Sequence, residues 1–355
     1  MRIPRGIART GLTVLAALTL GLVVLILVSD RPSRAVTFFF AGPFLNLYSF
    51  GNMLGSAVPL MLTGMGIVAA FRASVFNLGG EGQVYTGALI ATVVCLALPR
   101  LPGWAGILLS LAAGTLVGAV LAGLSGLFYA RWRTNELLSS FLLSAAAVLI
   151  VDYLIAGPLD DPASNLLATP AVASRFRLLR ILPPSYLDAG VAAVLLLAVL
   201  LTVYLFKTRS GYELRMCGSN REFAQYGGIR VGLYLVLPMV MSGGFHGLAG
   251  GMSILGTHYR CIQGFSVGLG WNGIAVALIG RNHPLGVIPA ALLYAYLEAG
   301  AQAAVLHAGM SFEIATLVQA VIFYLVTAQG LISWIPREGL LKHRGRPPLR
   351  GRRKR

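Results

Sequence analysis

The sequence predicts an all-α polytopic membrane protein with about ten transmembrane helices. Of its 355 residues, 57% are hydrophobic and only 11% are charged, whereas an average soluble domain has about 25% charged residues. The apolar residues form runs of about 20, the length that an α-helix needs to cross a hydrocarbon core about 30 Å thick. The net charge of +16 would suggest a nucleic-acid partner for a soluble protein, but too little polar surface exists here to cover a soluble core. A disordered basic chain is also excluded, because such chains are poor in large apolar residues.

Ten apolar segments qualify as candidate spans. Nine are long enough to cross, whereas 268–280 is short and contains Asn272, so we expect a half-helix or broken helix there. The first segment follows three arginines, as in a signal sequence, but it is longer than a signal core and lacks a cleavage site, so we expect it to be retained. The candidate spans are 10–28, 47–70, 77–98, 104–130, 137–156, 187–206, 231–255, 268–280, 285–306 and 312–335.

Lysine and arginine are distributed unequally between the two sets of loops. With ten spans both termini lie on one side, where the loops hold 21 basic residues, against 7 in the other loops. Because basic loops stay inside the cell, we predict that both termini are cytoplasmic. Helices 2–5 and 7–10 are offset by five crossings, an odd number, so we expect them to form an inverted repeat, a common plan of transporters.

The segments outside the spans differ in kind. We expect a transmembrane domain over 1–336 and a basic cytoplasmic tail over 337–355, whose charges suit the anionic surface of the lipid bilayer; no nucleic-acid partner is expected. The outer loop 157–186 is rich in proline and small residues and predicts an ordered surface loop. The inner segment 207–230 has no proline and places apolar residues at helical spacing, which predicts a short amphipathic helix along the cytoplasmic face.

Acidic residues inside apolar segments are candidates for function, because a carboxylate in a membrane is costly unless it faces water or a partner. Glu81 begins an apolar run after a glycine pair; it could line a path or cap its own helix at the cytoplasmic interface. Tyr294, Glu298 and Gln302 share one helix face at a spacing of four. That face could line a water-filled path or make polar contacts between helices. Asp152, near the outer end of its span, could reach the interface.

The sequence lacks the residues that several kinds of chemistry require. The sequence has no GxxxxGK[ST] phosphate-binding loop and no clustered metal-ligand motif. We therefore expect no cofactor, metal site or enzymatic activity, and ATP, if used, is bound by a partner subunit. Gly123-Leu124-Ser125-Gly126 matches the G-x-S-G of rhomboid-type intramembrane proteases, with His246 as its conceivable base, but glycine is too abundant for the match to be specific. His246 is better interpreted as a hydrogen-bonding core histidine. An ion-coupled secondary transporter using Glu81 and Glu298 is another alternative.

Four motifs resemble a known family. Residues 211–229 (GYELRMCGSNREFAQYGGI) are similar to the cytoplasmic coupling segment of bacterial ABC importer permeases of the monosaccharide and branched-chain amino acid family. Phe76–Gln83 (FNLGGEGQ), Thr134–Leu137 (TNEL) and Gly270–Pro284 (GWNGIAVALIGRNHP) resemble segments of its nucleoside-uptake branch, some members of which are described as simple-sugar permeases. The resemblance covers about residues 45–330.

The resemblance implies a permease subunit in the bacterial inner membrane that moves a small polar solute by alternating access. It implies a nucleoside as solute, with a simple sugar as the alternative. It also implies partner ATPase subunits, a second and non-identical permease, and an extracytoplasmic solute-binding lipoprotein. The residues that it assigns to ATPase coupling are Leu214, Arg215, Gly218, Asn220, Ala224, Tyr226, Gly227 and Ile229. The residues expected along the solute path are Asn77, Glu81, Gln83, Trp271, Asn272 and Glu298.

Overall fold

A computed structural model describes residues 18–27 and 29–327, and it is all-α over these residues, with two isolated β-bridges and no strand. Seven of its helices are long and apolar enough to cross a membrane, and three shorter apolar helices accompany them. The prediction of an all-α polytopic membrane protein is therefore confirmed. The expected tail at 337–355, and the outermost parts of the first and last candidate spans, lie outside the described residues. The cytoplasmic placement of the termini stays a prediction.

The helices follow the candidate spans closely, with one addition. An unlabelled helix at Leu18–Leu27 comes first. Helix α2 was not among the predicted elements, because its ten residues are too few to cross a membrane. The labelled helices are α2 (Pro32–Ala41), α3 (Leu47–Arg72), α4 (Gly80–Ala97), α5 (Gly103–Trp132), α6 (Glu136–Ala156), α7 (Gly190–Lys207), α8 (Arg209–Ser219), α9 (Arg221–Tyr226), α10 (Val231–Ser253), α11 (Leu269–Ile279), α12 (Pro284–Ala308) and α13 (Phe312–Thr327).

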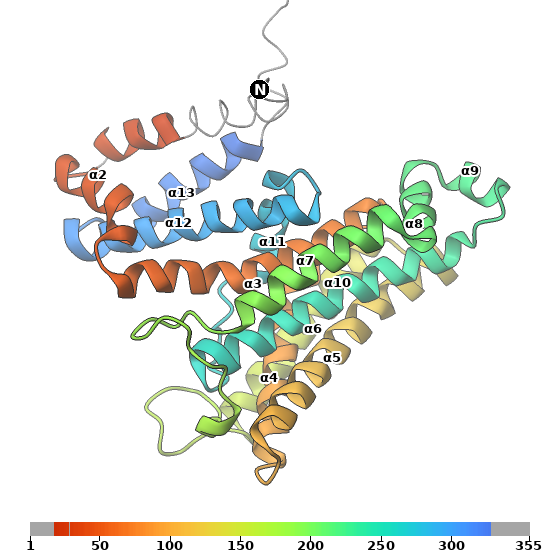
Figure 1. Cartoon of the computed structure of the whole chain (residues 1–355), viewed down its shortest axis with the longest axis horizontal. Helices are drawn as coiled ribbons and strands as arrows, with labels where there is room; N and C mark the ends of the chain where they lie inside the picture. The colour runs from red at the N-terminus through yellow and green to blue at the C-terminus, as the bar shows by residue number, and fades with distance from the viewer. Residues whose placement is uncertain (1–17, 28, 328–355) are drawn as a thin grey trace, which may run out of the picture.

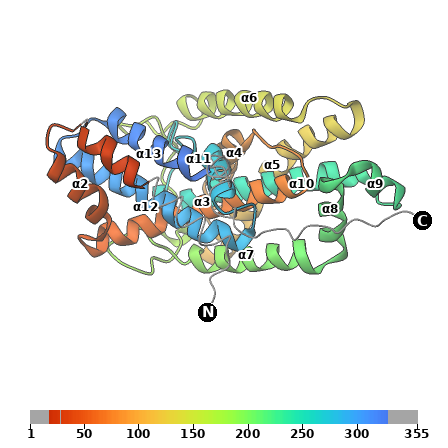
Figure 2. The ribbon, with the colours of Figure 1, turned by 90° about the horizontal axis from the view of Figure 1, so that it is seen from above.

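The helices form a bundle with a buried centre and a lipid-facing rim. Every residue of α3 from Leu60 to Ala70 is buried, as expected of a helix that is apolar on all sides. Figure 2 shows α6 and α7 on opposite sides of the bundle, with α3, α4, α10 and α11 between them. The outer helices α5, α6 and α7 leave large apolar side chains such as Leu149 and Leu196 exposed. These side chains suit contact with lipid tails.

The two ends of the bundle carry different structures. Figure 1 shows α8 and α9 together at one end of the long helices and the loop between α6 and α7 at the other. That loop contains the expected turn-rich surface segment 157–186. It is tied to the loop between α10 and α11 by backbone hydrogen bonds from Thr169 N to Cys261 O (3.0 Å) and from Val172 N to Tyr259 O (2.7 Å). The loop is therefore an integral part of this end of the bundle.

Two helices begin inside the bundle after non-helical segments. α11 has 11 residues and rises about 16 Å, roughly half the thickness of a hydrocarbon core, which confirms the expected half-helix. α4 begins at Gly80 after the non-helical residues 75–79. The two helices occupy corresponding places in the proposed halves of the chain. The inverted repeat itself stays a prediction.

Glycine allows α5 and α10 to pack backbone against backbone. A Cβ built on Gly243 would overlap the carbonyl oxygen of Gly118, and one built on Gly247 would overlap that of Gly114. These positions are spaced by four along both helices, so the contact runs as a continuous seam. Small residues at helix crossings are the usual means of close packing in membranes.

Replacing Gly247 by valine should destabilise the chain by about 3 kcal/mol, because overpacking a tight contact forces backbone shifts. The measurement is the thermal unfolding midpoint of the detergent-purified protein, together with its yield in membranes. Gly232→Val is the matched control, since Gly232 lies on the same helix with nothing within 4 Å of the added Cβ. Equal losses in the two variants would contradict the importance of the seam.

Candidate functional site

The N-termini of α4 and α11 meet inside the bundle at the Glu81 carboxylate. This group accepts hydrogen bonds from Ser266 Oγ (2.5 Å), Gly268 N (3.0 Å) and Gly270 N (3.0 Å). A helix start leaves backbone N–H groups unsatisfied and carries partial positive charge, so a carboxylate stabilises both helix starts at once. One interpretation of the sequence was that Glu81 caps its own helix, α4. Glu81 does cap a helix, but the backbone N–H groups that it accepts from belong to the start of α11. We call the contact of Glu81 with residues 266–270 the joint.

The joint depends on close backbone contact. A Cβ built on Gly270 would overlap the backbone of Gly80, and one built on Gly80 would lie 2.7 Å from Nε2 of His246. Both positions need glycine for this approach, whatever their dihedral angles.

Asn77 and Gln83 hold the segment before α4 in place. Asn77 Nδ2 donates to Gln83 Oε1 (2.8 Å) and to Ser242 Oγ of α10 (2.9 Å). Gln83 Nε2 donates in return to Asn77 Oδ1 (2.9 Å). Both side chains are buried, with exposed fractions of 1% and 2%. The pair thus fixes residues 77–83 against α10, away from the cavity described below, and its expected place on the solute path stays untested.

His246 is fully buried beneath the joint. Its Nδ1 lies 2.7 Å from Ser242 O, whereas Nε2 has no hydrogen-bond partner among the described residues. Only one of the two ring nitrogens of this histidine therefore has a hydrogen-bond partner among the described residues. Ser125 Oγ, the candidate nucleophile of the protease alternative, is engaged with Ser139 Oγ (2.6 Å) and with Glu136 O (3.2 Å). These contacts leave the serine and the histidine with different partners.

A cavity of about 680 Å³ lies between α3, α12, the end of α10 and the start of α11. Of the predicted path residues, Asn272 and Glu298 line it; Glu81 lies behind it, bound to the lining residue Ser266. Its polar lining residues are Asn46, Tyr48, Ser49, Asn52, Ser56, Tyr186, Ser253, Thr257, His258, Ser266, Asn272, Glu298, Gln302 and His307.

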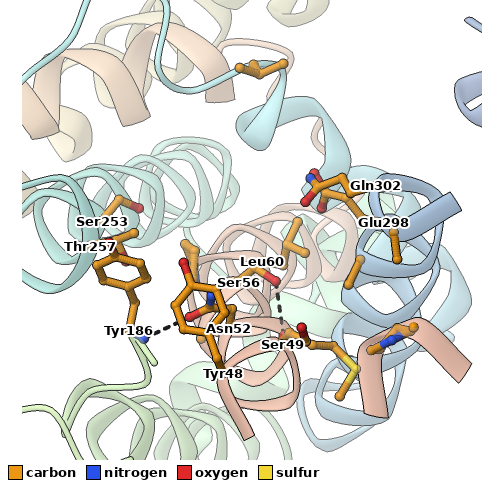
Figure 3. Close-up of a pocket in the computed structure, with 18 of the residues that line it drawn as sticks. Tyr48, Ser49, Asn52, Ser56, Leu60, Tyr186, Ser253, Thr257, Glu298 and Gln302 are labelled. Atoms are coloured by element: carbon orange, nitrogen blue, oxygen red, sulfur yellow. Dashed lines mark hydrogen bonds between the residues drawn. The ribbon is translucent and has the colours of Figure 1, made fainter. Parts of the chain in front are cut away.

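The cavity lies between two facing walls, one on α12 and one on α3. Figure 3 shows Glu298 and Gln302 together on α12, with Tyr48, Asn52 and Ser56 of α3 across the space and Tyr186 beyond them. Asn52 Oδ1 accepts a hydrogen bond from Tyr186 N (2.9 Å), which fixes the loop to α3. The walls thus combine hydroxyl and amide groups with aromatic rings.

Two predicted residues lie elsewhere. Trp271 is 45% exposed and packs edge-to-face on Phe141, with ring centroids 5.9 Å apart. Tyr294 is buried and stacks on Phe323 at 4.1 Å. The expected polar stripe on α12 is therefore split, and only Glu298 and Gln302 reach the cavity.

The polar residues of α3 that line the cavity were not predicted from the sequence. Ser49, Asn52 and Ser56 recur at spacings of three and four within an apolar helix, and this polar stripe could have indicated a lined path. Tyr186 carries no comparable local signal, because only the course of the outer loop brings it to the cavity.

The predicted amphipathic segment 207–230 folds as the two short helices α8 and α9. Leu214 of α8 and Ala224 of α9 are fully buried. The side chain of Asn220 caps α9 by accepting a hydrogen bond from Phe223 N (2.9 Å). Arg215 Nε donates to Leu205 O (2.9 Å). Gly218 packs against the backbone at the end of α3, and Ile229 packs on the core.

The opposite face of α9 is exposed and aromatic. Tyr226 is 95% exposed and Phe223, which was not among the predicted coupling residues, is 62% exposed; Gly227 ends the helix. On α8, hydrogen bonds from Arg209 and Tyr234 hold the pKa of Glu213 below its usual range. Six of the eight predicted coupling residues thus anchor or shape the segment, and Tyr226 forms its outer surface beside Gly227.

A comparison with protein-family models shows which family the chain belongs to. Residues 49–327 match the family model described as "Branched-chain amino acid transport system / permease component". The chain belongs to this permease family. It is the permease subunit of an ABC importer and a multi-pass protein of the bacterial inner membrane, as the resemblance implied. No solved structure matches it.

Relatives extend over nearly the whole permease. The "Probable riboflavin import permease protein RfuC" of Treponema pallidum is 35% identical over 319 residues, covering 88% of this chain and 82% of that protein. The guanosine permease NupP of Bacillus subtilis is 30% identical, covering 94% and 96%. The glucose permease TsgB13 of Haloferax volcanii is 32% identical, covering 90% and 86%. Among the described residues of the permease, no group of three metal-ligand side chains is found.

Proposed function

We propose that this permease moves a nucleoside inward across the membrane, driven by ATP hydrolysis in a partner subunit. The observation that carries the proposal is the cavity of about 680 Å³ that ends at the joint. This volume lies within the range of about 300–1,000 Å³ typical of small-molecule sites. Its aromatic rings offer stacking surfaces for a base, and its hydroxyl and amide groups suit the hydroxyls of a ribose.

Alternating access follows from the placement of the cavity. With cytoplasmic termini, the cavity lies in the outer half of the bundle, and the joint closes its inner end. Inward release requires the joint to open or tilt. The glycine contacts there leave no compressible side chains between the helices, so the movement is a rigid displacement of α4 against α11.

The cytoplasmic segment provides the link to ATP. Arg221 Nη2 donates to Ser74 O (2.9 Å), and Ser74 Oγ donates to Gly218 O (2.7 Å). Three residues beyond Ser74, Asn77 begins the network that positions α4. A movement of α8 and α9, imposed by an ATPase subunit docked on Phe223 and Tyr226, is therefore transmitted to the joint. ATP is bound by that partner, and this chain needs no cofactor of its own.

A second, non-identical permease completes the path in this proposal. The permease resembles the two B. subtilis proteins named as guanosine permeases, NupP at 30% identity and NupQ at 26%. It also resembles the two nucleoside permeases NupB and NupC of Lactococcus lactis. Paired permeases of the same named solute support a heterodimer.

An extracytoplasmic binding lipoprotein delivers the solute at the outer end. Arg177 and Arg180 of the outer loop lie over the ring of Tyr259, at 4.3 and 5.7 Å, and Arg180 also lies over Tyr186 at 4.7 Å. Tyr186 lines the cavity. Ordered positive charge beside the cavity suits an acidic docking surface on such a protein.

Uptake of labelled solutes tests the proposal. The complete transporter in proteoliposomes should take up a nucleoside only when ATP is present, and the permease alone should take up none under an ion gradient. Uptake of glucose without nucleoside would favour the sugar alternative, which the H. volcanii relative supports. Gradient-driven uptake by the permease alone would favour the ion-coupled alternative and contradict the proposal.

A further inference from the structure

The carboxylate of Glu298 lines the cavity without a protein partner. It makes no hydrogen bond or ion pair within the part of the chain that the structure describes, and the lining residues include no lysine or arginine. The other carboxylates inside the bundle differ in this respect. Glu81 accepts three hydrogen bonds at the joint, and Asp152 accepts one from Tyr85 Oη (2.6 Å).

An unpaired carboxylate in an apolar bundle restricts what can occupy the cavity. Its desolvation is costly unless a bound molecule supplies hydrogen bonds or charge. An ionised carboxylate accepts hydrogen bonds and donates none. Its two oxygens lie side by side, so they pair best with two parallel N–H donors, the geometry in which the charged guanidinium of arginine binds a carboxylate. A neutral molecule with two parallel N–H groups can match the same geometry. The wall around Glu298 therefore selects for adjacent donors.

The rest of the cavity favours a flat heteroaromatic partner over a small cation. Tyr48, Tyr186 and Phe265 contribute aromatic rings to its lining, and Ser49 and Asn52 contribute polar groups on the α3 wall. A small cation would use the carboxylate and leave most of a cavity of about 680 Å³ unfilled. A nucleoside fills it, with its base at Glu298 and its sugar hydroxyls among the polar groups of α3.

The nucleobases differ in the donors that they present. Guanine has a ring N–H beside an exocyclic amino group, so it offers two adjacent donors. Adenine and cytosine offer a donor beside an acceptor, and uracil offers one N–H between two carbonyl groups. A carboxylate attracts the first pattern and repels the acceptors in the others. Hypoxanthine keeps the ring N–H of guanine and lacks only the amino group.

We propose that Glu298 reads the base in the cavity and selects nucleosides of 2-amino-6-oxopurines, the guanosine class. The inference rests on the proposed function and specifies its solute. Gln302, four residues further on the same face of α12, lines the cavity beside it and can donate an amide N–H to the C6 carbonyl oxygen of the base. Glu298 is the specificity-determining residue in this arrangement.

Competition between guanosine and inosine tests the inference, because these solutes differ only by the amino group. Wild-type transporter in proteoliposomes should prefer guanosine by about tenfold or more, as expected for one hydrogen bond to a charged group. Glu298→Gln should bring the ratio close to one, since its amide NH₂ opposes the donors of guanine. Any selectivity of the binding lipoprotein is common to both transporters, so the change in ratio reports the cavity alone.

Two variants complete the test. Glu313→Gln makes the same chemical change at an exposed glutamate outside the cavity and should keep the wild-type ratio. Glu298→Asp keeps the carboxylate and should keep the preference for guanosine with weaker uptake. Where a variant transports too slowly, thermal stabilisation of the purified transporter by each nucleoside gives the same ratio.

The outcomes separate this inference from the proposed function. An unchanged guanosine-to-inosine ratio in Glu298→Gln would overturn the role of Glu298 and leave nucleoside transport standing. Stronger competition by spermidine than by guanosine would show that the carboxylate binds a cation and would also overturn it. Absence of uptake for every nucleoside by the wild-type transporter would overturn the proposed function itself.

Discussion

Glu81→Gln should reduce transport at least a hundredfold while the chain still inserts into the membrane. The Glu81 carboxylate accepts from one hydroxyl and two backbone N–H groups at the start of α11. Glutamine keeps one acceptor oxygen and replaces the other by an NH₂ group. This group faces hydrogen-bond donors but cannot accept hydrogen bonds from them. Hydrogen bonds to charged groups are worth about 1.5–3 kcal/mol each, so losing one or two of them leaves the joint without its fixed geometry. Uptake and thermal unfolding of the purified protein measure the effect.

Graded variants show whether the joint is the cause. Ser266→Ala removes one donor and leaves the carboxylate with both backbone N–H partners, so its transport should fall by about tenfold, less than that of Glu81→Gln. Glu313→Gln, at an exposed glutamate, should transport like the wild type. If Glu81→Gln transported normally, the joint would have no part in translocation.

The spans were predictable because a membrane imposes its pattern on contiguous residues. Runs of about 20 apolar residues located the long helices, and the short run at 268–280 located the half-helix α11. Glu81 stood out for the same local reason, as a carboxylate at the head of an apolar run. The exception was α2, which lacks the length of a span.

The site was predictable only where its signal is local. The donors that Glu81 binds are about 185 residues away in sequence, and no periodicity indicates a contact at that separation. Asn77 and Gln83 were singled out because they are polar residues in an apolar segment. Residue type alone, however, does not distinguish a side chain that lines a cavity from one that holds the backbone in place through hydrogen bonds. Glu298 and Asn272 were found because they interrupt apolar helices that happen to border the cavity.

Phe223→Ser combined with Tyr226→Ser should abolish ATP-driven transport by removing the docking surface on α9. The two rings are 62% and 95% exposed at the end of the bundle that carries α8 and α9. Burying an aromatic side chain in a partner is worth about 2 kcal/mol, so the loss of both weakens ATPase binding by roughly a thousandfold. Co-purification of the ATPase and solute-stimulated ATP hydrolysis measure the loss.

The control for this variant is Tyr153→Ser, which removes a ring that is 72% exposed on α6, away from α9, and should leave coupling unchanged. The double variant should keep the thermal stability of the permease, because Leu214 and Ala224 still seat the segment from beneath. Gly227→Arg should weaken coupling in the same way, since the nearest atoms to a Cβ there are 3.5 Å away and the new side chain projects beside Tyr226 without strain. Normal coupling in both variants would show that the ATPase docks elsewhere and that movement reaches the joint by a route other than Arg221 and Ser74.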